Sequence, residues 1–181
     1  NVSSNSGTGF SIGGGLHGVL QNNSIKLNGT SSIGASIQYG TGNWTLENNT
    51  FAGTTSTIFL VAANATRLKG DLSNISRIQF SSTLGLFPGL IVDQGAAGSI
   101  NWDAGLSGVA TSFNSNIALG NLTAFVNVSA MSVLNSSAQV IIGQVPYSSA
   151  KVTVDTSDNQ IFDDCVSCTI ENFASSQLTF N

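Results

Sequence analysis

Short runs in which apolar and polar residues alternate recur from one end of the chain to the other. In one of them Ile33, Ala35, Ile37 and Tyr39 share the same parity. A period of two places apolar side chains on one face of a β-strand. Glycine- and asparagine-containing turns separate the runs, and no helix longer than about two turns is indicated. Comparable runs cover residues 43–47, 77–81, 121–130, 139–145, 151–155, 169–173 and 177–180, and residues 57–63 form a continuous apolar run typical of a central strand.

Short strands at regular spacing predict an all-β fold. We expect an antiparallel β-sandwich of immunoglobulin-like or jelly-roll-like type. No internal repeat is recognised in the sequence.

The chain carries very little charge. Of 181 residues 8% are charged, against roughly 25% in ordinary soluble domains. Five Lys and Arg residues cannot neutralise a run of phosphates, so nucleic acid is not expected as a partner. Intrinsic disorder is disfavoured, because 41% of the residues are hydrophobic.

Asn-x-Ser/Thr triplets are about twice as frequent as chance predicts. With 43 Ser and Thr and 19 Asn in the chain, roughly five are expected, and ten occur. This density favours a secreted, heavily N-glycosylated protein. Covalent N-glycans are therefore the expected modification. The alternative is that a Ser/Thr-rich sequence forms such triplets by accident. The ten asparagines are Asn1, Asn22, Asn28, Asn43, Asn48, Asn64, Asn74, Asn121, Asn127 and Asn135.

No membrane span is predicted in the mature chain. The longest apolar stretch runs from Ile58 to Ala63, whereas a bilayer needs about 20 such residues. The long apolar N-terminal helix that builds type IV pili is also missing. Together with the glycosylation triplets, this predicts an extracellular location without a transmembrane anchor in the mature chain.

The two cysteines, Cys165 and Cys168, are separated by two residues. A redox-active pair normally opens a helix in a βαβ setting, and a zinc site needs about four ligands. Neither setting is indicated. We expect a structural disulfide that closes a tight turn, with free thiols as the alternative.

The N-terminal segment carries one apolar stripe interrupted by glycines. On an extended strand the stripe would share a single face. Such a segment is a poor independent strand, but it could add to the sheet of another polypeptide by β-augmentation. The alternative is an ordinary first strand of the chain's own domain. The residues of the stripe are Phe10, Ile12, Gly14, Leu16, Gly18 and Leu20.

This organisation resembles donor-strand pilins of the chaperone–usher type. Dense glycosylation triplets and low charge make it more similar to the archaeal thread pilin. The resemblance implies a pilin-type sandwich head at residues 22–181 and an extended N-terminal donor strand at residues 1–21. Phe10, Ile12, Leu16 and Leu20 would then fill the groove of a neighbouring copy, with Gly14 and Gly18 where that groove is tight. The implied product is a head-to-tail homopolymer, a cell-surface filament for adhesion or biofilm.

The main alternative is a self-contained β-sandwich binding module, such as an adhesin, an S-layer-type domain or a virion surface protein. Trp44 and Trp102 are the candidate aromatic residues for such a surface. No enzyme is expected. His17 is the only histidine, and the adjacent carboxylates Asp163 and Asp164 would point to opposite faces of a strand. No metal and no cofactor are therefore predicted.

Overall fold

The described part of the chain folds mainly into short β-strands, as its alternating pattern predicts. In this computed structural model 57% of the described residues lie in strands and 7% in helices. Several sheets are present, some strands are antiparallel, and two sheets pack face to face, so the predicted all-β, sandwich-type class is confirmed. The structure describes residues 2–4, 7–15, 17–28, 32–38, 43–53, 56–61, 66–83, 88–102, 105–120, 122–146, 152–154, 161, 163–174 and 176–181.

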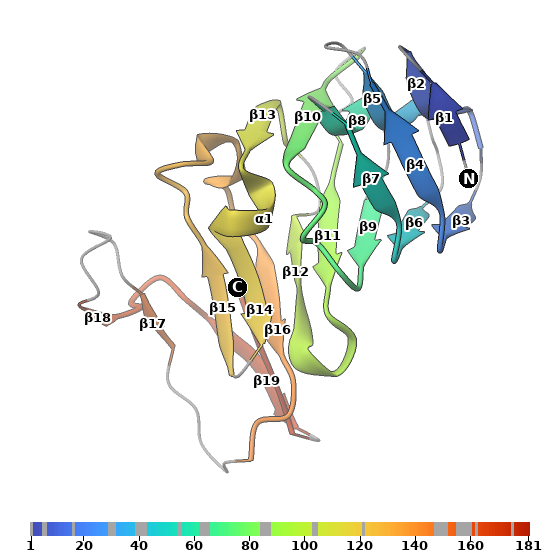
Figure 1. Ribbon diagram of the computed structural model, residues 1–181. Helices are drawn as coiled ribbons and strands as arrows, with labels where there is room; N and C mark the ends of the chain where they lie inside the picture. Colours follow the sequence, from blue (N-terminus) through green and yellow to red (C-terminus); the bar gives the residue numbers. More distant parts are fainter. Residues whose placement is uncertain are drawn as a thin grey trace.

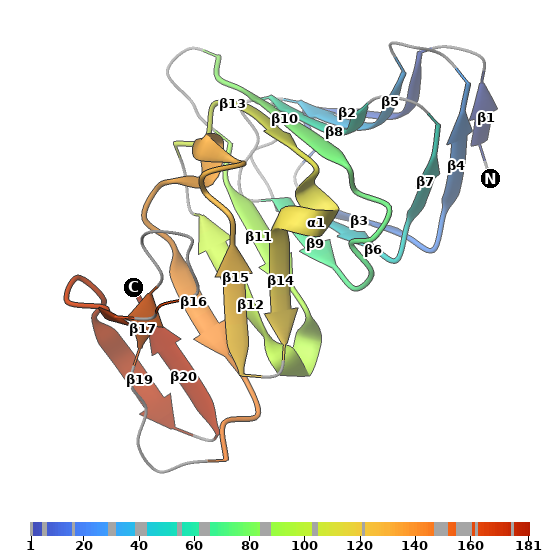
Figure 2. The same cartoon turned by 60° about the vertical axis from the view of Figure 1, so that its left-hand side comes forward.

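The first eleven strands, however, pair in parallel, where the sequence led us to expect antiparallel pairs. The backbone winds through three strands per coil, and each coil stacks on the one before (Figure 1, Figure 2). This winding is a β-solenoid. A parallel pair needs a connection of a dozen residues or more, and the rest of each coil supplies it.

The strands of the solenoid are listed here in chain order. The first coil holds β1 (Val2–Ser4), β2 (Thr8–Gly13) and β3 (Gly18–Gln21). The second holds β4 (Ser24–Leu27), β5 (Ile33–Gln38) and β6 (Trp44–Glu47). The third holds β7 (Thr50–Ala52), β8 (Ser56–Val61) and β9 (Thr66–Lys69), and the last contributes β10 (Arg77–Ser81) and β11 (Leu90–Asp93).

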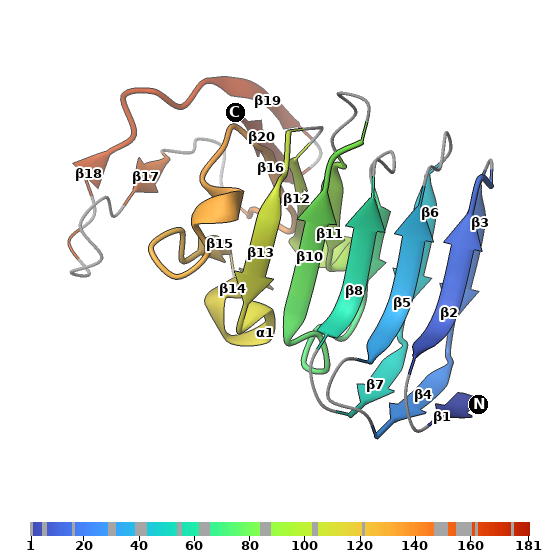
Figure 3. The ribbon, with the colours of Figure 1, turned by 90° about the horizontal axis from the view of Figure 1, so that it is seen from above.

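Equivalent strands of successive coils lie side by side, which reveals a repeat that sequence analysis missed. Ile12 lies beside Ile37, Ile37 beside Leu60 and Leu60 beside Phe80, at spacings of 25, 23 and 20 residues. Figure 3 shows β2, β5, β8 and β10 in this order. The prediction of no repeat is wrong, because what repeats is an inward apolar position at uneven spacing, not a fixed set of residues.

One corner of the solenoid repeats with particular clarity. β3, β6 and β9 are each followed by a residue in the left-handed conformation: Asn22 (φ 55°), Asn48 (φ 50°) and Gly70 (φ 83°). Glycine and asparagine adopt this conformation at the lowest cost. The N–H of each corner residue donates to a carbonyl of the next coil, at 3.0 to 3.2 Å. The corner therefore joins successive coils as well as turning the chain.

An amide ladder follows this corner inside the solenoid. Asn49 is buried, with 5% of its surface exposed. Its Nδ2 donates to the Leu20 carbonyl at 2.6 Å, and its Oδ1 accepts from the Asn23 backbone N–H at 3.0 Å and from Asn23 Nδ2 at 3.1 Å. The Asn49 side chain thus joins the first coil to the second at the corner, between the paired strands β3–β6 and β4–β7.

Asp71 occupies the position after the third corner. Its carboxylate accepts hydrogen bonds from the Ser73 N–H at 2.8 Å and from Ser73 Oγ at 2.9 Å. The backbone bond, followed by the hydroxyl bond, lowers the pKa of Asp71 below its usual 3.8. Because the pKa is lower in the folded chain than in the unfolded chain, these bonds favour folding above the ordinary carboxyl pKa. Their contribution is lost as the pH falls through the lower, folded-state value.

The amide ladder gives a first testable prediction. Asn49→Ala leaves the Leu20 carbonyl and the Asn23 donors without their partner, so the free energy of unfolding should fall by about 1–3 kcal/mol. Gln21→Ala, a change at an exposed residue of the neighbouring strand β3, is the control and should change it by less than about 0.5 kcal/mol. Urea unfolding measures both, and equal effects would show that the ladder does not stabilise the fold.

Beyond the solenoid the pairing becomes antiparallel. The sheet that contains β3, β6, β9 and β11 continues through four more strands to become eight-stranded, and the sheet that contains β2 gains one strand to become five-stranded. A hairpin covers part of the eight-stranded sheet, and a short two-stranded pair lies near the C-terminus (Figure 1). These strands are β12 (Gly98–Trp102), β13 (Gly108–Thr111), β14 (Ile117–Gly120), β15 (Thr123–Val126), β16 (Gln139–Ile142), β17 (Thr153–Val154), β18 (Asp163–Asp164), β19 (Ile170–Ala174) and β20 (Gln177–Phe180).

Helices are few and short. They are α1 (Phe113–Asn116), η1 (Gly95–Ala97) and η2 (Ser132–Leu134). Across the part of the chain that the structure describes, none has the length and apolar character needed to cross a bilayer.

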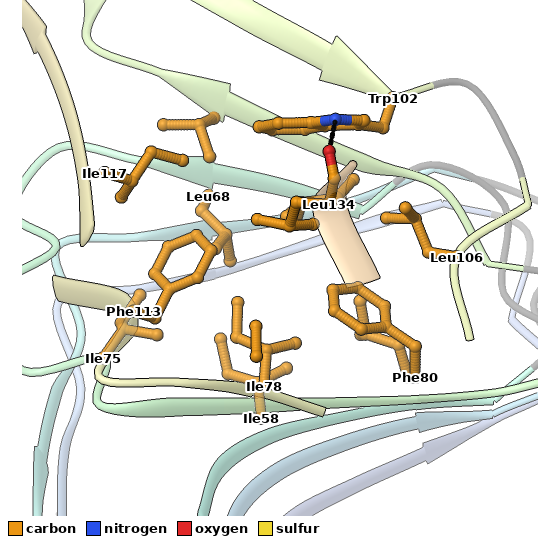
Figure 4. Close-up of a cluster of buried hydrophobic side chains, with 14 of the residues drawn as sticks. Ile58, Leu68, Ile75, Ile78, Phe80, Trp102, Leu106, Phe113, Ile117 and Leu134 are labelled. Atoms are coloured by element: carbon orange, nitrogen blue, oxygen red, sulfur yellow. Dashed lines mark hydrogen bonds between the residues drawn. The ribbon is translucent and has the colours of Figure 1, made fainter. Parts of the chain in front are cut away.

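Inward side chains of the five-stranded and eight-stranded sheets form one main core. Trp102 lies in it with 1% of its surface exposed, and its Nε1 donates to the Leu134 carbonyl at 3.3 Å (Figure 4). Phe113, from the short helix α1, packs into the same cluster. Because Trp102 is enclosed, it cannot serve as the exposed aromatic residue that a binding module would use.

Candidate functional site: the open edge of the first coil

The first coil supplies the outermost strand of all three solenoid sheets. β1 ends the three-stranded sheet, β2 ends the five-stranded sheet, and β3 ends the eight-stranded sheet. Figure 3 shows them together at one end of the molecule, in dark blue. Each is paired on one side, and among the described residues no strand pairs with its other side. Such an edge is a ready template for pairing with another chain.

The predicted donor strand is not one extended strand. Phe10 and Ile12 lie on β2, whereas Gly18 and Leu20 lie on β3, in a different sheet. Between them Gly14 adopts a φ of 69° and donates its N–H to the Gln38 carbonyl at 3.1 Å. Gly14, which we expected to permit close approach, here allows the chain to bend. Leu16 falls outside the described residues.

The proposed boundary between a tail at 1–21 and a head at 22–181 lies inside the continuous solenoid. β2 pairs with β5, and β3 pairs with β6, of the same chain. Residues 8–13 and 18–21 are therefore not a free tail in this structure. Their exchange into a neighbouring copy stays a prediction.

The side chains of this coil are only partly covered. Phe10, Ile12 and Leu20 are half-buried, and the last two pack against the main core. Val19, which alternates with Leu20 on β3, is 59% exposed. A coil in the middle of a solenoid is covered from both sides, so the partial burial reflects the missing neighbour.

Trp44 fixes β3 to the second coil. Its ring lies over Gly18, where an added Cβ would stand 2.1 Å from the nearest ring atom, and it also covers Gly15. Glycine is required at position 18 for this close approach, not for a special backbone angle. Trp44 is half-buried in this contact, so it too is a packing residue.

This contact gives a second prediction. Gly18→Ala should lower the free energy of unfolding by about 1–3 kcal/mol, because the indole must shift to admit a methyl group. Gly13→Ala is the matched control in the same coil, since nothing lies within 4 Å of its added Cβ. Thermal unfolding followed by circular dichroism compares them. If both variants melt together, the Trp44 contact does not hold β3 in place.

Backbone groups of β3 alternate in direction. The Gly18 N–H donates to the Asn43 carbonyl at 3.4 Å, and the Asn22 N–H donates to the Glu47 carbonyl at 3.0 Å. In a parallel ladder every second residue bonds to the same neighbour. Val19 and Gln21 therefore direct their N–H and C=O groups away from β6, toward the open side.

Natural sheets protect such edges with charged residues, proline or bulges. Residues 1–25 contain no Asp, Glu, Lys, Arg or Pro. His17 is the one titratable side chain in this range, and its Nδ1 accepts a hydrogen bond from the Asn43 N–H at 3.1 Å. The first coil thus lacks two of these protections, proline and charged residues other than histidine.

The structure does not bring the polar candidates for catalysis together. β3, next to His17, and β18, which contains Asp163 and Asp164, lie at opposite ends of the molecule (Figure 1). Within the described ranges, no group of three or more His, Cys, Asp or Glu side chains could hold a metal ion.

The predicted disulfide is confirmed. Cys165 and Cys168 are bonded, with their Cα atoms 5.3 Å apart. They enclose Val166, which is 98% exposed, and the Cys165 N–H donates to the Val152 carbonyl at 3.1 Å. The bond closes a surface turn directly after β18, as its close spacing suggested.

Most of the predicted glycosylation asparagines that the structure describes are exposed. Asn74 and Asn127 are half-buried, and Asn1, Asn64 and Asn121 lie outside the described residues. Asn22 and Asn48 occupy equivalent corners of adjacent coils. The exposed ones are Asn22, Asn28, Asn43, Asn48 and Asn135.

We expect the five exposed asparagines to carry glycans when the chain is produced in a secretory host. Glycopeptide mass spectrometry measures occupancy at each site. Thr50→Ala should remove the glycan from Asn48 alone, because it destroys that triplet without changing the corner residue. Unmodified peptides at all five positions would contradict the prediction of a glycosylated surface.

Sequence reasoning missed two exposed apolar residues at strand edges. Val19 lies in the predicted donor segment but on its polar parity, and Ile170, 45% exposed, begins β19 at the other end of the eight-stranded sheet. The strand pattern predicted β19, whereas it placed the residues of β3 within one longer donor strand. Nothing in a single sequence marks which strands will be outermost.

Comparison with known proteins adds no further identification, since no family model, curated protein or solved structure matches the chain.

Proposed function

We propose that this chain is a structural subunit of an extracellular, N-glycosylated filament on a cell surface, in which copies join through β-strand pairing. One observation carries the proposal: among the described strands, the three of the first coil each have an unpaired side, in a segment without charge or proline. The density of glycosylation triplets supports the extracellular location.

The proposal keeps the homopolymer that the resemblance to thread pilins implies but places the contact differently. In a donor-strand pilin the guest strand fills a gap within a neighbouring sandwich. Here β2 and β3 already occupy sheet positions in their own chain, at the edge. Docking of a further strand against that edge requires no exchange and leaves the solenoid intact.

The energies indicate a contact that depends on high local concentration. Two outward residues on β3 offer about three free backbone groups, because the Gln21 carbonyl already accepts a hydrogen bond from Asn23 Nδ2 at 2.8 Å. Each new backbone hydrogen bond contributes about 0.5–1.5 kcal/mol. Association costs about 4 kcal/mol or more in lost translational and rotational freedom. Hydrogen bonds alone barely offset this cost, so burial of Val19 and of the half-buried residues beneath it must add to the contact. Crowding of chains at a cell surface would favour assembly.

Electron microscopy and light scattering test the proposal. The full chain should form thin filaments, and Val19→Lys should remain monomeric, because a charge on the edge strand opposes pairing. Val166→Lys is the control: it makes the same change at a more exposed apolar residue, at the disulfide turn, and should leave filaments unchanged. A full chain that stays monomeric at high concentration would overturn the proposal and favour the self-contained binding module.

A further inference from the structure

We propose that the junction between copies joins the two ends of the eight-stranded sheet, with β3 of one copy against β19 of the next. This inference rests on the proposed self-association and names the surfaces that would carry it. The partner is a second copy of this chain, and the sheet would continue from subunit to subunit.

The order of strands leaves this sheet open at both ends. It runs from β19 through β20, β16, β12, β11, β9 and β6 to β3. Among the described residues, β19 pairs only with β20 and β3 only with β6. The five-stranded sheet differs at its far end, because η2 packs beside β13 there: a Cβ on Gly108 would lie 3.6 Å from Val133. The eight-stranded sheet is therefore the better candidate for continuation.

Strand directions fit a head-to-tail junction. β3, β6, β9 and β11 are parallel. Four successive antiparallel pairings, β11 to β12, β12 to β16, β16 to β20 and β20 to β19, bring β19 back to the direction of β3. A copy advanced along the sheet would thus present β3 parallel to β19, so repeated addition keeps every subunit in the same orientation. Such a heterologous contact propagates as an open filament.

The two edges also resemble each other chemically. β3 has four residues and β19 has five. Each carries a β-branched side chain that is exposed although apolar, Val19 at 59% and Ile170 at 45%. Each also carries a half-buried apolar residue, Leu20 on β3, which packs on the main core, and Phe173 on β19, which packs on a second, smaller cluster. Joining the edges would cover all four.

Charge does not oppose the contact. β3 carries none, and the single charged residue of β19 is Glu171. Its Oε2 accepts a hydrogen bond from Gln139 Nε2 at 2.8 Å, which holds the carboxylate toward β16, on the side away from the open edge. A neighbouring β3 would therefore meet backbone groups and uncharged side chains, Asn172 among them, along a strand whose register shifts between Ile170 and Asn172.

Cross-linking tests this junction in the full chain. The two native cysteines are bonded to each other, so introduced cysteines would be the only free thiols. Val19→Cys/Ile170→Cys, assembled and treated with a bismaleimide of about 10 Å span, should give a ladder of covalent multimers on a denaturing gel. That span tolerates a register slip of about two residues, at about 3.3 Å per residue between strands about 4.8 Å apart. The single variants are the matched controls and should stay monomeric on the gel, with filaments still visible by electron microscopy.

The outcomes separate the inference from the function on which it rests. Dimers from Val19→Cys alone would overturn it, because they require two first coils to meet about a two-fold axis. Filaments of the double variant that yield no cross-linked multimers would also overturn it, while leaving the proposed function standing. Absence of filaments from the unmodified chain would overturn both. A ladder from the double variant, with none from either single variant, would support the junction.

Discussion

Stacking of coils in register is the constraint on which the rest of this structure depends. An inward residue such as Ile37 is covered because an equivalent residue lies beside it in the coil before and in the coil after. The corner N–H groups and the Asn49 amide satisfy their hydrogen bonds across the same interval. Each coil is therefore stabilised by its neighbours. A coil with only one neighbour keeps apolar side chains partly exposed and lacks the hydrogen bonds that a second neighbour would supply. The first coil of this chain is in that position.

At the far end of the solenoid, the last coil is covered by later parts of the same chain. There β12 and β13 turn back and pair antiparallel with β11 and β10. Hairpin β14–β15 and η2 then contribute residues to the main core, where Trp102 donates to the Leu134 carbonyl. The eight-stranded sheet continues past this covered coil to its other edge at β19. Its two edges, β3 and β19, are different surfaces, so a contact between them can repeat head to tail.

Sequence reasoning recovered what depends on local pattern. Alternation gave the strands and the all-β class, and the close spacing of Cys165 and Cys168 gave their disulfide. It did not recover the pairing. A run such as residues 33–39 has the same period of two in a parallel coil as in an antiparallel hairpin, because the period reports which face is buried and not which strand lies alongside.

The repeat was hidden for a related reason. The corners Asn22-Asn23-Ser24 and Asn48-Asn49-Thr50 are similar, yet the third corner is Gly70-Asp71-Leu72, and coils differ in length by several residues. The predicted donor segment forms two strands in two sheets, because the bend at Gly14 is held by a hydrogen bond to Gln38 of the neighbouring coil, which the sequence does not show. Its apolar residues were identified, but the exposed edge residue Val19 was assigned no role.

Hydrogen exchange at single-residue resolution tests the central claim, that the free side of the first coil joins copies, most directly. In separated chains the Val19 and Gln21 amides, which face away from β6, should exchange rapidly, whereas the Leu20 amide on the bonded side should be slow. In the assembled material the account predicts that Val19 and Gln21 become as protected as Leu20. If both amides still exchange rapidly in filaments, β3 is not at the junction and the account is contradicted.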